Sequence, residues 1–140
     1  LDARWNMMMA STEGAMAFSK GLGAVHSMSH AIGANQELRL HHGTLNGVIL
    51  PTVIRFNKDH VGNKLPRILK AMGKSESADL ADEIEKFNEK ISLPNGLKEM
   101  GVTEEMIPEL VEHSITDPSN VTTPKLPSPE EWEQLFLDAM

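Results

Sequence analysis

The stretch that decides the fold of this chain lies between residues 21 and 56. It begins with Gly21-Leu-Gly-Ala-Val-His26-Ser-Met-Ser-His30-Ala-Ile-Gly33 and ends with Thr44-Leu-Asn-Gly-Val-Ile-Leu-Pro51-Thr-Val-Ile-Arg-Phe56. In the second part, apolar side chains recur three and four residues apart, which predicts an amphipathic helix that Pro51 kinks. A buried strand is the alternative, because the run is apolar and partly β-branched. Its length, and the lack of a partner strand pattern nearby, favour the helix.

The sequence on both sides of this stretch also predicts helices. We expect them over residues 1–20, 26–35 and 64–72, from Ser77 onward, and from Ser128 to the end. Ser128-Pro129-Glu130-Glu131 has the pattern of a capping box, with proline at the first helical position. No repeat or strand pattern competes. We therefore predict an all-α, multi-helix fold that forms one domain over residues 1–140.

The clearest of these predicted helices begins at Ser77. Leu80, Ile84, Phe87 and Ile91 recur at helical spacing, and this predicts that they share one buried face. Asp117–Pro127, by contrast, is rich in proline, serine and threonine, which is typical of a loop.

Composition excludes several classes of partner and chemistry. The chain of 140 residues carries 13 basic and 20 acidic residues, a formal net charge of −7, without a run of Lys or Arg. This argues against nucleic acid and anionic membrane as partners. There is no cysteine, so disulfides and thiolate chemistry are excluded and any metal must be held by nitrogen and oxygen. No membrane span or signal peptide is recognisable, and a cytoplasmic location is the expectation.

Four of the six histidines fall within residues 26–42. On a helix, His26 and His30 would lie on one face, within reach of a common ion, and His42 would add a third nitrogen from another element. The alternative without a metal is that His26 and His30 are simply polar side chains hydrogen-bonded within a helical turn. A zinc-protease site is excluded, because Ser27 stands where that motif needs a glutamate.

These residues carry a family resemblance. Gly21–Gly33 and His42–Asn57 closely resemble the glycine–histidine signature of the iron-containing (group III) alcohol dehydrogenases. The resemblance extends over all 140 residues. It includes Ala15-Met-Ala-Phe18 before the signature, Ala71-Met-Gly73 after it, and near the end Asp117, Asn120, Thr122-Thr-Pro124 and Pro129-Glu-Glu-Trp132.

The resemblance implies a function and roles for three histidines. His26 and His42 match metal ligands of the family, and the following Gly43 distinguishes His42 from His41. His30 matches the residue beside the nicotinamide and substrate, with a role in catalysis and cofactor binding. The implied reaction interconverts a primary alcohol or diol and an aldehyde or ketone, with Fe²⁺ (or Zn²⁺) and NAD or NADP as cofactors. Two further ligands and the cofactor loop would lie outside this chain.

The resemblance also implies that this chain is the C-terminal helical domain of a larger homo-oligomeric enzyme. It would need an N-terminal NAD(P)-binding α/β domain as partner, and alone it would be inactive. The apolar spacing that starts at Leu1 and Trp5 agrees with a segment from the interior of a protein. Two alternatives remain open: a stand-alone helical interaction module without catalysis, and a small metal-storage or metal-sensing protein.

Overall fold

The computed structural model describes all 140 residues and contains no strand. The α-helices are α1 (Asp2–Phe18), α2 (Ala24–Gly33), α3 (His42–Asn57), α4 (Lys64–Ala71), α5 (Leu80–Lys90), α6 (Ile107–Thr116) and α7 (Pro129–Asp138). Four short 3₁₀ segments connect them: η1 (Lys58–His60), η2 (Lys98–Met100), η3 (Glu104–Met106) and η4 (Pro118–Thr122). The predicted all-α fold is confirmed.

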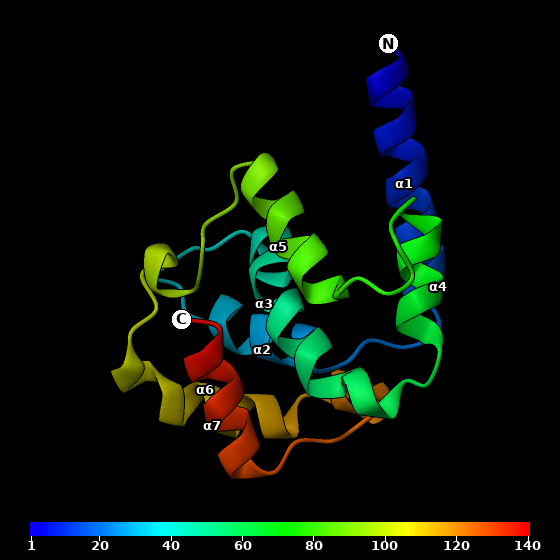
Figure 1. The fold of residues 1–140 in the computed structure, drawn as a ribbon. Helices are drawn as coiled ribbons and strands as arrows, with labels where there is room; N and C mark the ends of the chain where they lie inside the picture. Colours follow the sequence, from blue (N-terminus) through cyan, green and yellow to red (C-terminus); the bar gives the residue numbers. More distant parts are fainter.

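The core lies where α2 packs between α3 and α6, with α7 closing against α6 and α3 (Figure 1). Its largest fully buried side chains are Met28, Ile32, Leu45, Ile49, Leu97, Trp132 and Phe136. Burying each such side chain stabilises the fold by about 1.5–3 kcal/mol. The core therefore holds α2 and the start of α3, which carry the histidines, in a fixed relative position.

Pro51 lies inside α3 and is buried. Because proline has no N–H, the carbonyl of Gly47, one turn earlier, has no helical donor. Asn88 of α5 supplies one, its Nδ2 lying 2.7 Å from that carbonyl oxygen. Pro51 thus creates a free carbonyl on α3, and the hydrogen bond from Asn88 to that carbonyl helps to fix where α5 packs.

Helix α5 begins later than the sequence predicts. Asp79, not Ser77, is the N-cap, and its carboxylate accepts hydrogen bonds from the backbone N–H groups of residues 81 and 82. The expected buried face is also only partly right: Leu80 is buried, whereas Phe87 and Ile91 are about half exposed. Toward its end, α5 contacts α3 through the polar side chain of Asn88, while Phe87 and Ile91 stay open to solvent.

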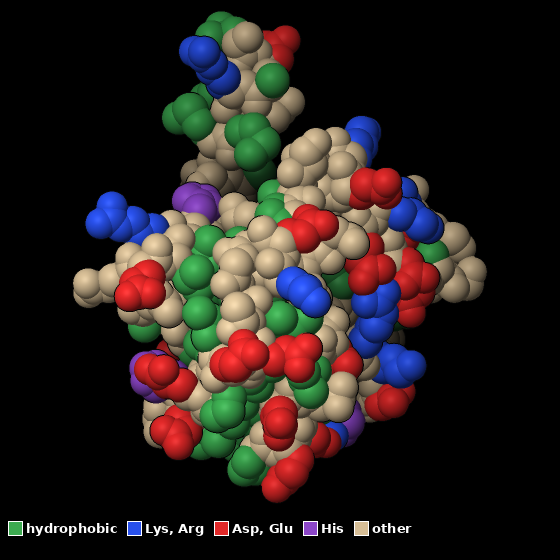
Figure 2. All heavy atoms as spheres, turned by 90° about the vertical axis from the view of Figure 1, so that its left-hand side faces the viewer, with side chains coloured by type: hydrophobic (Ala, Val, Ile, Leu, Met, Phe, Trp, Pro, Cys, Tyr) green, Lys and Arg blue, Asp and Glu red, His purple; other side chains and the backbone are tan.

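Helix α1 projects from the rest of the molecule (Figure 1) and has no buried residue. Figure 2 shows it as a stalk that carries apolar side chains on its surface. Its exposed apolar residues are Leu1, Trp5, Met7, Met8, Met9, Met16 and Phe18. Trp132 and Met28, by contrast, are fully buried in the core.

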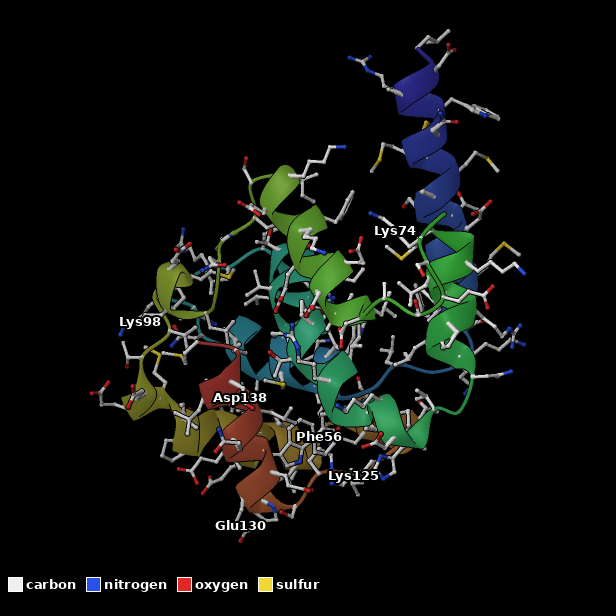
Figure 3. All side chains as sticks on the ribbon, in the orientation of Figure 1. Phe56, Lys74, Lys98, Lys125, Glu130 and Asp138 are labelled. Carbon is white, nitrogen blue, oxygen red and sulfur yellow. The ribbon has the colours of Figure 1, made fainter.

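The C-terminal segment fits the sequence pattern closely. The capping box of Ser128 and Glu131 forms at the start of α7, so that prediction is confirmed. Lys125, in the preceding loop, contacts the Glu131 carboxylate and lies 4.5 Å from the ring centre of Phe56 on α3 (Figure 3). These contacts fasten the loop and α7 to the end of α3. None of the helices is both long and apolar enough to cross a lipid bilayer.

Candidate functional site

A close approach between Gly21 and Thr122 determines where the first turn of α2 lies. Gly21 has a φ of +120°, and a Cβ atom there would lie 2.3 Å from Oγ1 of Thr122. That hydroxyl donates a hydrogen bond to the carbonyl of Leu22 at 2.6 Å. Only glycine allows this conformation and this contact together. The chain can therefore turn sharply against η4 and begin α2 at Ala24, which puts His26 and His30 on one helical face.

The structure brings His26, His30 and His42 together. The ring centre of His42 lies 5.3 Å from those of both His26 and His30, and the rings of His26 and His30 are 5.8 Å apart. His42 is the first residue of α3, so two helices supply the three imidazoles. This is the arrangement that the glycine–histidine pattern predicts, while the role of each ring stays a prediction.

Asn46 shows where two of the imidazole nitrogens point. Its Nδ2 lies 3.0 Å from Nε2 of His42 and 3.4 Å from Nε2 of His26. In this orientation of the Asn46 amide, its NH₂ group donates to both Nε2 atoms, which corresponds to the Nδ1–H tautomer of each ring. In His42 that Nδ1 lies 3.4 Å from Oγ of Ser29. The lone pairs of His26 and His42 are therefore directed toward one small region.

The surroundings favour the neutral form of both rings. The pKa of His26 is lowered by burial and then by the neighbouring His42 and His30, with an opposing effect of Asp117. The pKa of His42 is lowered by burial and then by His30 and His41. Neutral imidazole is the form that binds a metal ion.

His30 has a partner on the other side of the site. Its Nδ1 lies 3.0 Å from Oδ2 of Asp117, at the junction of α6 and η4. In the sequence, Asp117 marks the start of a loop and belongs to the family resemblance near the end of the chain, and neither observation points to His30. The two residues are 87 positions apart, and no local pattern in the sequence links them.

The remaining histidines lie outside this cluster. His41 caps α3, its Nδ1 accepting a hydrogen bond from the backbone N–H of Thr44 at 3.3 Å. His60 and His113 are exposed, as their polar surroundings predict. No group of three or more His, Asp or Glu side chains in the chain is arranged to hold a metal ion. The Nε2 atoms of His26 and His42 converge on Asn46, and no third His, Asp or Glu side chain joins them in a metal-binding arrangement.

An apolar cavity of about 480 Å³ adjoins the cluster. His26 and Asn46 lie at one side of it. The apolar side chains around it include those of Phe18, Leu22, Val25, Leu50, Ile54 and Leu65. The histidine cluster is therefore polar on the side of Asp117 and apolar on the side of α4.

Residues 1–140 match the model of the Fe-containing alcohol dehydrogenase family, C-terminal part. The chain belongs to this family. It is 40% identical over 146 residues to 4-hydroxybutyrate dehydrogenase of Cupriavidus necator, and the match covers 99% of this chain and 38% of that protein. It is 32% identical to 1,3-propanediol dehydrogenase of Citrobacter freundii and 31% identical to lactaldehyde reductase of Escherichia coli K12, with the same coverage in each case.

Solved structures of iron-containing alcohol dehydrogenases share the fold. The crystal structure of a 1,3-propanediol oxidoreductase superposes with a TM-score of 0.77 at 28% identity, over 85% of this chain and 33% of that one. The iron-containing alcohol dehydrogenase of Thermococcus thioreducens superposes with a TM-score of 0.72 at 29% identity, over 84% of this chain and 32% of that one. The chain thus spans 38% of the length of the relatives named above and matches about a third of each solved structure.

Proposed function

We propose that this chain is the helical domain of an NAD(P)-dependent, metal-dependent alcohol dehydrogenase that interconverts a primary alcohol or diol and an aldehyde or ketone. The observation that carries the proposal is the convergence of His26, His30 and His42 from two helices. The relatives named as dehydrogenases or reductases of hydroxy acids, diols and aldehydes support this class of substrate.

His26 and His42 are the metal ligands of the proposal. Their donor set suits Fe²⁺ or Zn²⁺, because both ions accept imidazole nitrogen, and burial favours the neutral rings that ligation requires. The amide of Asn46, which bridges the two Nε2 atoms, would have to release them. A bound ion of this kind supplies Lewis acidity to the oxygen of the alcohol or carbonyl. His30 is the residue beside the substrate and the nicotinamide.

An N-terminal α/β domain is the proposed partner of this chain. Two nitrogen ligands do not complete a coordination shell of four to six, so the remaining ligands and the nicotinamide site would come from that domain. The uncovered apolar surface of α1 supports such a partner, since a soluble domain rarely leaves so many large apolar side chains in water. We expect the assembled enzyme to be a homo-oligomer.

Metal binding by this chain tests whether it supplies only two of the metal ligands, with the others coming from the proposed N-terminal domain. In calorimetry with Fe²⁺ under anaerobic conditions, or with Zn²⁺, we expect weak binding that His42→Ala abolishes. His60→Ala is the matched control, because His60 is exposed and outside the cluster. The chain should form no NADH from primary alcohols or diols. Submicromolar affinity, or turnover above background, would show that this chain is more complete than proposed.

Activity of the full-length protein separates this proposal from an interaction module without catalysis. An open reading frame that also encodes a nicotinamide-binding domain, and turnover of a primary alcohol that is lost in His26→Ala and His42→Ala, are the expected results. A natural protein that consists of this domain alone would instead support the interaction module.

A further inference from the structure

Asp117 has no role in the function proposed above, although it faces His30, one of the three clustered histidines. Its Oδ2 lies 3.0 Å from Nδ1 of His30, and its side chain is 13% exposed against 41% for His30. The contact thus joins a largely buried carboxylate to a ring that is open to the site.

The carboxylate is held in place independently of His30. Asp117 is the N-cap of η4, and its Oδ1 accepts a hydrogen bond from the backbone N–H of Ser119 at 2.8 Å. Burial opposes ionisation, but hydrogen bonds from Ser119 and His30 outweigh it and lower the pKa of Asp117. At neutral pH the group facing His30 is therefore a fixed anion.

A buried polar network anchors the segment that carries Asp117 to α2. Asn120 accepts a hydrogen bond from the Ser27 hydroxyl at 2.6 Å and donates from Nδ2 to the carbonyl of Ser114 at 2.5 Å. The Ser114 hydroxyl in turn donates to the carbonyl of Ser27 at 3.4 Å. These three side chains are buried. Because Ser27 and His30 are neighbours on α2, the network fixes the distance between Asp117 and the His30 ring.

An ionised carboxylate only accepts hydrogen bonds, so the proton of a neutral His30 must reside on Nδ1. No hydrogen bond within the chain engages Nε2 of the same ring. We propose that Asp117 is a positioning residue, which holds His30 in the Nδ1–H tautomer and leaves the Nε2 lone pair free on the side of the site.

For the reaction, this inference rests on the proposed function. A free Nε2 can take up the proton that an alcohol loses on oxidation and return it to the oxygen of an aldehyde on reduction. The nearby carboxylate then stabilises the imidazolium that forms, as the aspartate does in a Ser-His-Asp triad. Asp117 itself touches no substrate in this scheme.

The test uses Asp117→Asn, which separates positioning from capping. Asparagine caps a helix start about as well as aspartate, so η4 should stay intact. Its amide both donates and accepts, so it no longer dictates where the His30 proton resides. Asp79→Asn is the matched control, because Asp79 caps α5 in the same way and has no histidine partner.

The readout is ¹⁵N NMR of the ring nitrogens in this chain at a pH where His30 is neutral. We expect a protonated Nδ1 and an unprotonated Nε2 in the wild type and in Asp79→Asn, and a substantial Nε2–H population in Asp117→Asn. A wild-type His30 with its proton on Nε2 would overturn the inference, and this measurement needs no variant to fold. An Asp117→Asn spectrum identical to the wild type would overturn it as well.

A second measurement distinguishes failure of this inference from failure of the proposed function. In the full-length protein, Asp117→Asn should lower kcat with little change in KM, by up to about 10⁴-fold, the loss that asparagine causes in place of the aspartate that orients a catalytic histidine. If the tautomer shifts while kcat does not, Asp117 positions His30 as inferred, and the catalytic role proposed for His30 is wrong.

Discussion

Different residues at this site meet two separate conditions, one of backbone conformation and one of chemistry. Gly21 meets the first, because its positive φ and its contact with Thr122 admit no side chain. His26 and His42 meet the second, because their partial burial keeps them neutral while Nε2 still faces the cluster. The glycine is structural and the histidines are chemical, but the position of His26 depends on Gly21.

Replacing Gly21 with alanine should therefore destabilise the domain. A side chain at a φ of +120° costs about 1–3 kcal/mol from backbone strain alone, and the contact with Thr122 adds to it. Urea unfolding measures the free energy of unfolding. Gly33→Ala is the control, since nothing lies within 4 Å of a Cβ there. Equal stability of the two variants would contradict the role given to Gly21.

The two histidines also make a pH-dependent contribution to stability. Their pKa values are lowered from the ordinary 6.5 by burial and by neighbouring histidines: His42 and His30 act on His26, and His30 and His41 act on His42. The unfolded chain then binds more protons than the folded chain at mildly acidic pH, so the free energy of unfolding falls as the pH drops below 6.5. NMR titration should give midpoints below 6.5 for His26 and His42. A midpoint at or above that value for either ring would be inconsistent with this environment.

The parts of the site that could be predicted from sequence are the local ones. His26 and His30 share a helical face because four residues separate them, and His42 follows after one short link, so chain geometry alone keeps all three near one another. Asp117 could not be predicted, because its contact with His30 depends on how α6 packs against α2. The Asn46 amide was missed for a different reason: an asparagine has no sequence signature when its partners are side chains.

At the scale of elements, the fold depends on side chains that replace missing backbone contacts. Asn88 replaces the donor that Pro51 removes from α3. Asp79 and Ser128 supply the hydrogen bonds that the first turns of α5 and α7 lack. The cap of α7 could be predicted, because Ser128 and Glu131 form a capping-box pattern in the sequence. The role of Asn88 could not be predicted, since the residue that compensates for a proline can come from any neighbouring helix.

A double-mutant cycle tests the link between α3 and α5. Asn88→Ala should lower the free energy of unfolding by about 1–3 kcal/mol, because it leaves the Gly47 carbonyl without a donor. In a Pro51→Ala background, residue 51 has an N–H that can bond the same carbonyl, so the cost of Asn88→Ala should shrink. Equal costs in the two backgrounds would show that Asn88 does not compensate for the proline.

The whole molecule has more surface than a compact domain of its mass. A folded monomer of 15.4 kDa is expected to expose about 7,200 Å², whereas this chain exposes 9159 Å². Helix α1, with no buried residue, is the visible source of excess surface. Trp5, Met8, Met9 and Met16 recur at helical spacing on one side of α1, and Met7 and Phe18 lie on the opposite side. Apolar faces of this kind are normally covered by a packing partner.

Removal of residues 1–20 should leave the remaining domain folded. Because α1 contributes no buried residue, we expect an unchanged free energy of unfolding and less self-association in sedimentation velocity. Removal of residues 129–140 is the contrasting deletion, and it should abolish folding because Trp132 and Phe136 leave the core. A marked loss of stability on removing α1 would mean that the helix packs on the domain in solution.

Oxidation of the exposed methionines of α1 reports whether this helix is in contact with solvent or covered. Thioethers in water oxidise to sulfoxides, and burial protects them. Met7, Met8, Met9 and Met16 are exposed, whereas Met28 is fully enclosed. Brief peroxide treatment followed by mass spectrometry should therefore label the first four and spare the fifth. The same footprint on a longer form of the protein would reveal, peptide by peptide, which side of α1 a partner covers.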